Sequence, residues 1–454
     1  MDIDCAVRGG TVVFPERGTV PATILIRDGR IVGIAAPGEE TPTARRVVDA
    51  AGKHVFPGLI DAHLHFGFAE PLTEYATETA SAAIGGISTV IAYFLTSNPY
   101  SEIFAGAKRD AEARAHVDFG FHFSTASEQH LAEMGRYVGE FGVNSFKYFM
   151  NFKGEEGRYM GLDGTDDGFL YDLMQESARL KDVVLVIHPE NIEIVKRMKT
   201  RFMAEGRATL KDWSLSKPDF TETESIVRAM VFARQFGARI YIVHLSCKSG
   251  LDEIRFHRQR YDRVLVETCP QYLTHTMDSD LGPIGKANPP LRTQEDVEAM
   301  WAGIADGAID VVASDHVPRK RATKEKGIWQ ASQGFPGTAM ILPVLLSEGY
   351  HKRGLSLQRI AQVAGSRPAE IFGIDGRKGR IAIGADADLT VVDLGLSRVV
   401  RAADLGSWSD YSLYDGWTLK GWPVLTMVRG TDVMRDGRIV GPQGHGRFLA
   451  RPMA

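Results

Sequence analysis

Between about residue 58 and residue 375, short apolar runs rich in β-branched and aromatic residues alternate with longer segments of helical spacing, such as Thr293–Gly307. Eight such units, each a short apolar run followed by a helical segment, occupy about 310 residues. They predict an α/β fold, a closed (β/α)₈ barrel of the TIM type. An open, doubly wound parallel sheet is the alternative. The eight short runs are Leu59–His65, Ile87–Phe94, Val117–Phe123, Val143–Met150, Val183–His188, Arg239–His244, Val264–Thr268 and Ile309–Ala313.

Both flanks of this region carry short β runs separated by Gly and Asp-Gly turns, with little helical periodicity. The heptapeptide RDGRIVG occurs twice, at 27–33 and at 435–441, each time after a β run. The repeat predicts two similar hairpins, although coincidence between two common turns is the alternative. We therefore expect residues 1–57 and 376–454 to form one small β-sandwich domain, and residues 58–375 to form the barrel.

Charge and composition exclude several classes of protein. The chain has 53 Lys and Arg against 57 Asp and Glu, a formal net charge of −4, and no basic block that could follow a phosphate backbone. No apolar run approaches the roughly 18 residues of a membrane span, and the first residues lack a signal-peptide pattern. The three cysteines fit no disulfide framework. We expect a cytoplasmic protein that binds neither nucleic acid nor membrane.

Residues that can bind metal ions cluster at the ends of five predicted strands, where a barrel places its active site. His63 and His65 lie two residues apart, so they point to the same face of the first strand. The other strands end with a lysine, two histidines and an aspartate: Lys147, His188, His244 and Asp315. Four histidines and an aspartate at one barrel mouth predict a metal site, because burying them otherwise requires a dense polar network.

Two divalent ions would need an anionic ligand between them, and four neutral imidazoles with one carboxylate supply little negative charge. Lys147 is the remaining inward candidate, and it could bridge two ions if CO₂ carboxylated its amine to a carbamate. The spacing alone does not show that chemistry.

Nine short motifs resemble those of the amidohydrolase superfamily, in the cyclic amidohydrolase branch of hydantoinases, dihydropyrimidinases, allantoinases and dihydroorotases. The resemblance spans nearly the whole chain. The motifs are GLIDAHLHF (58–66), SFKYFM (145–150), IHPEN (187–191), VHLS (243–246), ETCPQYL (267–273), NPPLR (288–292), SDHVP (314–318), YSLYDGW (411–417) and GWPVLTMVRG (421–430).

The resemblance implies a binuclear metal centre, with Zn²⁺ as the expected metal. His63, His65 and Asp315 would hold the more buried ion, His188 and His244 the second, and carboxylated Lys147 would bridge them. A hydroxide between the ions would attack the substrate carbonyl, while Asp315 serves as general base and then as general acid. Family members commonly form homotetramers or dimers, so we expect a homo-oligomer.

Several positions depart from the pattern of one branch or another. Gly67 stands where dihydroorotases carry an arginine for the substrate carboxylate, yet Asn288 resembles the dihydroorotase form. Phe152 replaces the tyrosine whose hydroxyl helps stabilise the oxyanion in hydantoinases, and Tyr159 is a candidate replacement. His316 is expected either to orient Asp315 or to contact the substrate.

The sequence therefore favours a hydrolase that opens a cyclic amide or imide of the hydantoin or dihydropyrimidine type. An allantoinase- or dihydroorotase-like enzyme, or a hydrolase of an atypical cyclic or linear amide, is the second hypothesis. A non-catalytic scaffold of the same fold is the third; scaffolds of this superfamily have lost metal ligands, whereas all six positions are present here.

Overall fold

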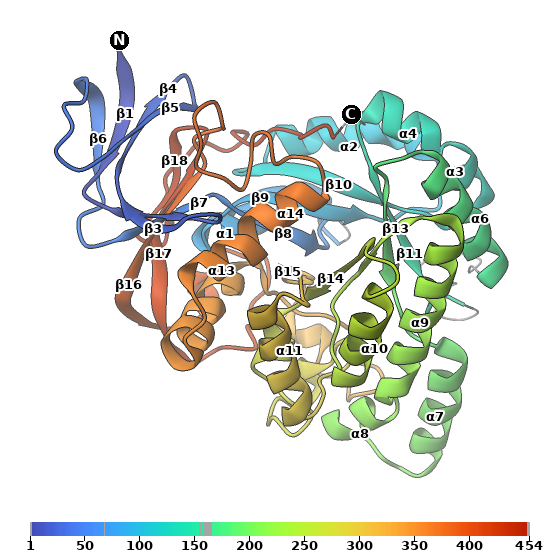
Figure 1. The fold of residues 1–454 in the computed structure, drawn as a ribbon. Helices are drawn as coiled ribbons and strands as arrows, with labels where there is room; N and C mark the ends of the chain where they lie inside the picture. The colour runs from blue at the N-terminus through green and yellow to red at the C-terminus, as the bar shows by residue number, and fades with distance from the viewer. Residues whose placement is uncertain (1, 68, 154–156, 158–165, 452–454) are drawn as a thin grey trace. The chain divides into compact units, whose positions relative to one another are not determined.

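The structure is a computed structural model that describes residues 2–67, 69–153, 157 and 166–451. Its largest sheet has eight strands, which lie side by side in the order of the sequence from β8 to β15 (Figure 1). The strands are β8 (Leu59–Leu64), β9 (Ile87–Phe94), β10 (Asp118–Ser124), β11 (Ser145–Phe149), β12 (Val184–His188), β13 (Arg239–Ile242), β14 (Val264–Thr268) and β15 (Val311–Val312).

This strand order decides between the two α/β architectures that the sequence allows. A doubly wound sheet reverses its order at a switch point, whereas here every strand pairs with its neighbours in sequence. The sheet forms a nearly closed parallel barrel, which confirms the predicted (β/α)₈ fold.

Helices follow the barrel strands along the chain, as βα units require. Their bounds are α1 (Pro71–Ile84), α2 (Tyr100–Glu112), α3 (Glu128–Ala132), α4 (Met134–Phe141), α6 (Asp167–Arg179), α7 (Ile192–Ala204), α8 (Leu210–Leu215), α9 (Asp219–Phe236), α10 (Lys248–Arg258), α11 (Gln294–Asp306), α12 (Ile341–Val344), α13 (Leu357–Ala361) and α14 (Arg367–Ile371).

Local sequence signals explain where α11 begins and ends. The Thr293 side chain accepts from the amide of Asp296, and the Asp296 carboxylate accepts from the amide of Thr293, a reciprocal N-terminal cap. Gly307 ends the helix with φ 90°, a conformation that glycine adopts without steric cost. The helix matches the predicted segment Thr293–Gly307 to within one residue at each end.

Strands β13 and β15 end before the positions that the hydrophobic pattern predicts. β13 stops at Ile242 and β15 contains only Val311 and Val312. The cause lies just beyond each strand, where His244 has φ 40° and Asp315 has φ 49°. These left-handed conformations cannot continue an extended strand. The backbone therefore turns at each of these two candidate ligands.

Two further sheets are built largely or partly from the segment before the barrel. One has the order β5-β4-β1-β6, and the other has the order β19-β18-β17-β16-β7-β2-β3, which combines strands from both flanks of the barrel sequence. The strands are β1 (Ile3–Arg8), β2 (Thr11–Phe14), β3 (Gly18–Pro21), β4 (Thr23–Arg27), β5 (Arg30–Ala35), β6 (Ala44–Asp49), β7 (His54–Pro57), β16 (Leu389–Val399), β17 (Thr418–Val428), β18 (Thr431–Arg435) and β19 (Arg438–Ile439).

The repeated heptapeptide forms a hairpin in each of these sheets, as predicted. β4 pairs with β5 and β18 pairs with β19, both antiparallel. Asp28 and Asp436 have φ 52° and 51°, and the glycines that follow them also have positive φ. Two successive positive φ values are the mark of a type I′ turn, which explains why Asp-Gly occurs in both copies.

By internal contacts the chain divides into two compact units. One comprises Met1–Ile91, Arg109–Gly120 and Gly337–Leu449, and the other comprises Ala92–Lys108, Phe121–Pro336 and Ala450–Ala454. Apolar side chains from both flanks of the barrel sequence share one core in the first unit, including Val12, Val55, Leu389 and Met427. The predicted domain limits at residues 57 and 376 stay a prediction.

A buried ionic cluster lies within the first unit. The Lys378 ammonium, 1% exposed, lies 2.5 Å from Asp118, 2.7 Å from Asp388 and 3.1 Å from Asp386. Arg429 is a second cation paired with Asp118. Burial alone would lower the pKa of Lys378, but the carboxylates raise it above its usual value, so the lysine carries its charge.

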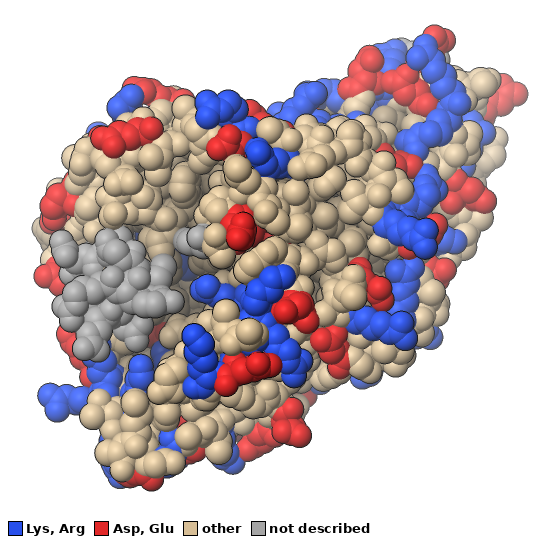
Figure 2. Space-filling model, turned by 180° about the vertical axis from the view of Figure 1, so that it is seen from behind, with Lys and Arg blue, Asp and Glu red and all other residues tan. Residues whose placement is uncertain are grey.

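Surface charge is mixed on the face drawn in Figure 2, where Lys and Arg side chains are interspersed with Asp and Glu side chains. Among the described helices, none has the length and apolar character needed to cross a membrane.

Replacing Lys378 with methionine is expected to lower the free energy of unfolding by about 3–5 kcal/mol, because the buried carboxylates lose their shared cation. Urea unfolding followed by circular dichroism measures the change. Lys420→Met, at an exposed position of β17, should stay within about 0.5 kcal/mol of the parent protein. Equal stability of the two variants would contradict the role of the cluster.

Candidate active site

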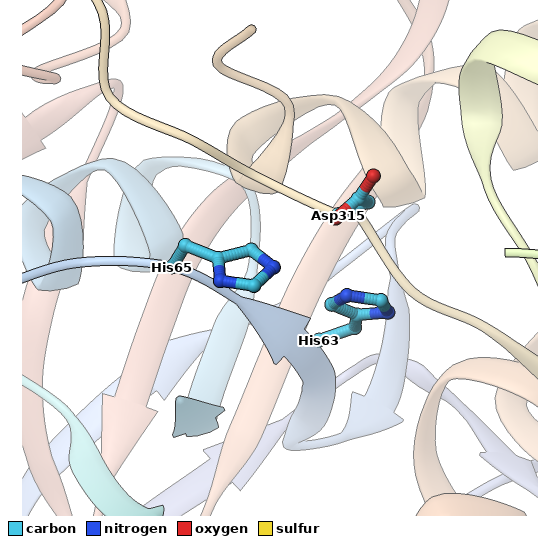
Figure 3. A group of neighbouring side chains, drawn as sticks. All are labelled: His63, His65 and Asp315. Atoms are coloured by element: carbon cyan, nitrogen blue, oxygen red, sulfur yellow. The ribbon is translucent and has the colours of Figure 1, made fainter. Parts of the chain in front are cut away.

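Three predicted ligands form one group. His63 and His65 come from the end of β8, and Asp315 comes from the segment after β15 (Figure 3). Each offers one ligand atom, and these atoms lie within 4.8 Å of one another. Two imidazoles and a carboxylate at this spacing are a donor set that Zn²⁺ and similar divalent ions accept.

The histidines that end β12 and follow β13 form a second group. His188 Nδ1 lies 2.8 Å from His244 Nε2. The other ring nitrogen of His188, Nε2, lies 2.7 Å from the Glu190 carboxylate, and Glu190 in turn accepts from Lys217 Nζ at 2.9 Å. All of these side chains are buried.

The Glu190 carboxylate determines which ring nitrogen of His188 carries the proton. Burial alone would raise the pKa of Glu190, but the Lys217 ammonium and the His188 hydrogen bond lower it to about 2, so it is ionised. Burial lowers the pKa of His188, which keeps the ring neutral near pH 7. A neutral ring that donates from Nε2 to Glu190 turns its Nδ1 lone pair toward His244, as a metal ligand must.

The left-handed turn at His244 is held by Glu267 from the neighbouring strand β14. Glu267 Oε1 accepts from the His244 amide at 3.0 Å, and Oε2 accepts from the Tyr241 hydroxyl at 2.8 Å. A non-glycine residue at positive φ persists only where its surroundings fix it. Glu267 thus supports the backbone conformation that places the imidazole of His244.

Lys147 lies in the middle of β11 with 1% of its surface exposed. Its Nζ lies 4.5 Å from the centre of the Tyr93 ring and 5.1 Å from that of Phe149. Burial between these rings lowers the pKa of Lys147 to about 7, although Glu267 and Asp315 oppose the shift. A large fraction of this amine is therefore uncharged near neutral pH, and an uncharged amine is the nucleophilic form.

The residues expected to contact substrate differ in how the structure places them. Phe152 stacks on Phe149, with ring centres 4.2 Å apart, and Phe149 lies beside His188. Asn288 is half-buried and donates from Nδ2 to Gln333. His316 is buried, and its amide donates to Ser314. Tyr159 lies outside the described residues.

A buried polar network accounts for the arginine of the motif NPPLR. Arg292 of NPPLR donates to Glu222 at 2.8 Å, to Ser246 Oγ at 2.9 Å and to the Lys217 carbonyl at 2.5 Å. Glu222 also accepts from the amide of Ser246, two residues after His244. The network thus anchors the chain on both sides of the His188–His244 pair.

Sequence reasoning missed Glu190, Lys217 and Glu267 as parts of the site. Glu190 had a signal, because it follows His188 at the spacing of two that puts both side chains on one face of an extended chain. Glu267 also had one, because it opens the motif ETCPQYL at the end of a predicted strand. Lys217 had none, since it reaches Glu190 only through a contact between segments 27 positions apart in sequence.

Comparison with known proteins gives the class. A family model described as the amidohydrolase family matches residues 54–440, which is most of the chain. The protein belongs to the amidohydrolase family, and its relatives place it in the branch of the cyclic amidohydrolases.

Relatives in that branch match nearly full length. The L-hydantoinase of Paenarthrobacter aurescens is 34% identical over 96% of this chain and 95% of its own length. An allantoinase of Rubrobacter xylanophilus is 37% identical over 98% of this chain and 97% of its own. The solved L-hydantoinase (dihydropyrimidinase) from Arthrobacter aurescens superposes with a TM-score of 0.93 at 33% identity, covering 99% and 100% of the two chains.

Glu190→Gln is expected to weaken Zn²⁺ binding about 10–100-fold, because the amide no longer fixes the protonation and orientation of His188. Zinc content after dialysis against graded free Zn²⁺ measures the effect, and circular dichroism checks folding. Glu193→Gln makes the same change at an exposed position three residues on and should bind zinc like the parent protein. Unchanged zinc affinity in folded Glu190→Gln would contradict the role of Glu190 in orienting His188.

Proposed function

We propose that this protein hydrolyses a C–N bond in a cyclic amide or imide of the hydantoin or dihydropyrimidine type. The main support is the set of imidazole and carboxylate side chains at or just beyond the carboxyl ends of the barrel strands, together with the buried Lys147 on β11. Relatives named hydantoinase and allantoinase share the chain over nearly its full length, which points to the substrate class.

The residues fit two divalent metal ions, for which we propose Zn²⁺. His63, His65 and Asp315 would hold one ion, and His188 and His244 the other. The closeness of the two rings supports the second position, since His188 Nδ1 and His244 Nε2 lie 2.8 Å apart and imidazole nitrogens are ligands that Zn²⁺ accepts. When bound, such ions polarise the substrate carbonyl and lower the pKa of a water molecule.

Lys147 would complete the site as a carbamate. The uncharged amine attacks the carbon of CO₂, one C=O electron pair becomes a carboxylate, and the proton lost from nitrogen passes to water. The desolvated amine between Tyr93 and Phe149 supports this step, because only the free base can react. The product replaces a buried amine with the anionic ligand that two divalent cations need.

Asp315 would move the proton during hydrolysis. Ring opening forms a C–O bond from water to the carbonyl carbon and breaks the C–N bond, so one proton must travel from the water to the leaving nitrogen. A carboxylate close to the metal position can accept that proton and return it to the nitrogen. The left-handed backbone at Asp315 supports this role, because such conformations occur where geometry is functionally constrained.

A substrate related to allantoin is the second candidate. The allantoinase of Rubrobacter xylanophilus is as similar to this chain as the hydantoinases are, and Phe152 brings no hydroxyl to the wall beside Phe149 and His188. Loss of one oxyanion donor costs about 2.7–4 kcal/mol in a transition state, so a substrate that needs no such donor is favoured. His316 and Asn288 remain proposed substrate contacts, and assembly as a homo-oligomer remains a prediction.

The first test is ring opening by the zinc-supplemented protein against dihydrouracil, 5-substituted hydantoins, allantoin, dihydroorotate and succinimide in parallel. We expect turnover of hydantoins, dihydrouracil or allantoin, and no turnover of dihydroorotate, because Gly67 offers no cation for its carboxylate. Chromatographic detection of the ring-opened acid measures each rate. Inactivity on all five rings with two zinc ions bound would contradict the proposed substrate class.

Lys147→Ala is expected to lower the bound zinc from two ions toward one or none and to abolish turnover, because the anionic bridge is lost. Short carboxylic acids such as propionate should restore part of the zinc and activity by occupying the space of the carbamate. Lys153→Ala, a half-buried lysine six residues on, should behave like the parent protein. Full activity in Lys147→Ala would rule out the binuclear site.

A further inference from the structure

Another buried basic side chain lies in the same unit as Lys147, that of Arg451. The side chain of Arg451 has 0% of its surface exposed. It donates to Ser145 Oγ at 2.9 Å and to the Phe121 carbonyl, while its backbone amide donates to the Gly142 carbonyl at 2.7 Å. Among the described residues no carboxylate pairs with Arg451, and burial lowers its pKa to about 9.

An unpaired buried guanidinium is costly, so its position needs an explanation. Arg292, the other buried arginine among the described residues, is paired with Glu222. Arg451 instead donates hydrogen bonds to a hydroxyl and a carbonyl of the barrel strands. The positive charge is thereby held inside the barrel without a neutralising partner among the described residues.

A short chain of contacts links Arg451 to Lys147. Ser145 Oγ accepts from Arg451, which leaves its own proton for His122 Nδ1 at 2.7 Å. The His122 ring stacks on Tyr93 with ring centres 4.6 Å apart, and Lys147 Nζ lies 4.5 Å from the centre of that Tyr93 ring. Arg451 therefore fixes, through three side chains, the aromatic wall against which the lysine amine rests.

The strand geometry gives a second, shorter link. Ser145 and Lys147 are two residues apart on β11, so both side chains project to the same face, about 6.6–7 Å from each other along the strand. Arg451 binds directly to Ser145, so its charge and the lysine amine belong to the same face of β11. A buried positive charge on that face is offset by an anion at the position of Lys147, because opposite charges attract strongly away from water.

We propose that Arg451 is a positioning residue that promotes the carboxylation of Lys147, by holding the Ser145–His122–Tyr93 wall and by supplying a buried positive charge that the carbamate offsets. This inference rests on the proposed function, since it assumes that Lys147 becomes a carbamate. It adds a residue far from the metal ligands in sequence, which acts on the lysine and touches neither metal nor substrate.

The test measures how much bicarbonate the metal-free protein needs to take up zinc. Parent protein and Arg451→Met are stripped of metal, equilibrated with graded ¹³C-bicarbonate and Zn²⁺, and analysed for zinc content and for the carbamate ¹³C signal. We expect Arg451→Met to need about tenfold more bicarbonate for half-maximal zinc, on the order expected for losing a buried unit charge. Arg447→Met, an exposed position four residues earlier, should need no more than the parent.

Two further variants keep the test decisive if Arg451→Met folds poorly. Arg451→Lys retains the charge and should recover part of the bicarbonate affinity, which a purely structural role would not predict. Ser145→Ala cuts the link but leaves the guanidinium, and should raise the bicarbonate requirement less than Arg451→Met. A parent-like requirement in folded Arg451→Met or Ser145→Ala, or equal shifts in Arg451→Met and Arg447→Met, would overturn the inference.

The outcomes also separate this inference from the proposed function. A carbamate signal in the parent protein with an unchanged bicarbonate requirement in Arg451→Met contradicts only the role of Arg451. A parent protein that binds two zinc ions and opens rings without any carbamate signal contradicts the role of Lys147 and, with it, that of Arg451.

Discussion

The need to bury charged side chains at the carboxyl ends of parallel strands shapes this site. Burying a carboxylate or a cation costs several kcal/mol unless a partner offsets the charge. In this barrel each buried carboxylate of the site has such partners. Glu190 is held between Lys217 and His188, and Glu222 between Arg292 and Ser246. The partners of Glu190 lie within one βα unit, whereas Glu222, Ser246 and Arg292 come from three different units. The partners that neutralise charge are therefore also the partners that aim the imidazoles.

A buried carboxylate also stabilises an unfavourable backbone conformation. His244 and Asp315 adopt left-handed conformations that a side chain rarely takes, and both end short strands. At His244 the Glu267 carboxylate accepts from the strained amide itself. Strain of this kind persists where surrounding contacts over-determine it, so the contact from Glu267 that holds the backbone at His244 also places this candidate ligand.

Much of this architecture could be predicted from the sequence, because period-two and helical hydrophobic patterns report directly on which faces are buried. The strand β9 at Ile87–Phe94 and the two Asp-Gly hairpins match the predictions. Strand ends were less predictable, since φ at His244 depends on a carboxylate from the next strand. Partners such as Lys217 and Arg451 carry no local pattern at all. Their roles come from contacts between residues dozens or hundreds of positions apart.

The seven-stranded sheet can be completed only late in the synthesis of the chain. β7, at His54–Pro57, hydrogen-bonds to β16, at Leu389–Val399, so more than 300 residues separate the two partners in the chain. At about 5–20 residues per second a ribosome needs roughly 15–70 s to make the intervening segment. Throughout that interval the β7 edge has no native neighbour on that side and is open to pairing with other nascent chains. Overproduction at low temperature or with chaperones would therefore be expected to raise the yield of folded protein more than any change to the active site.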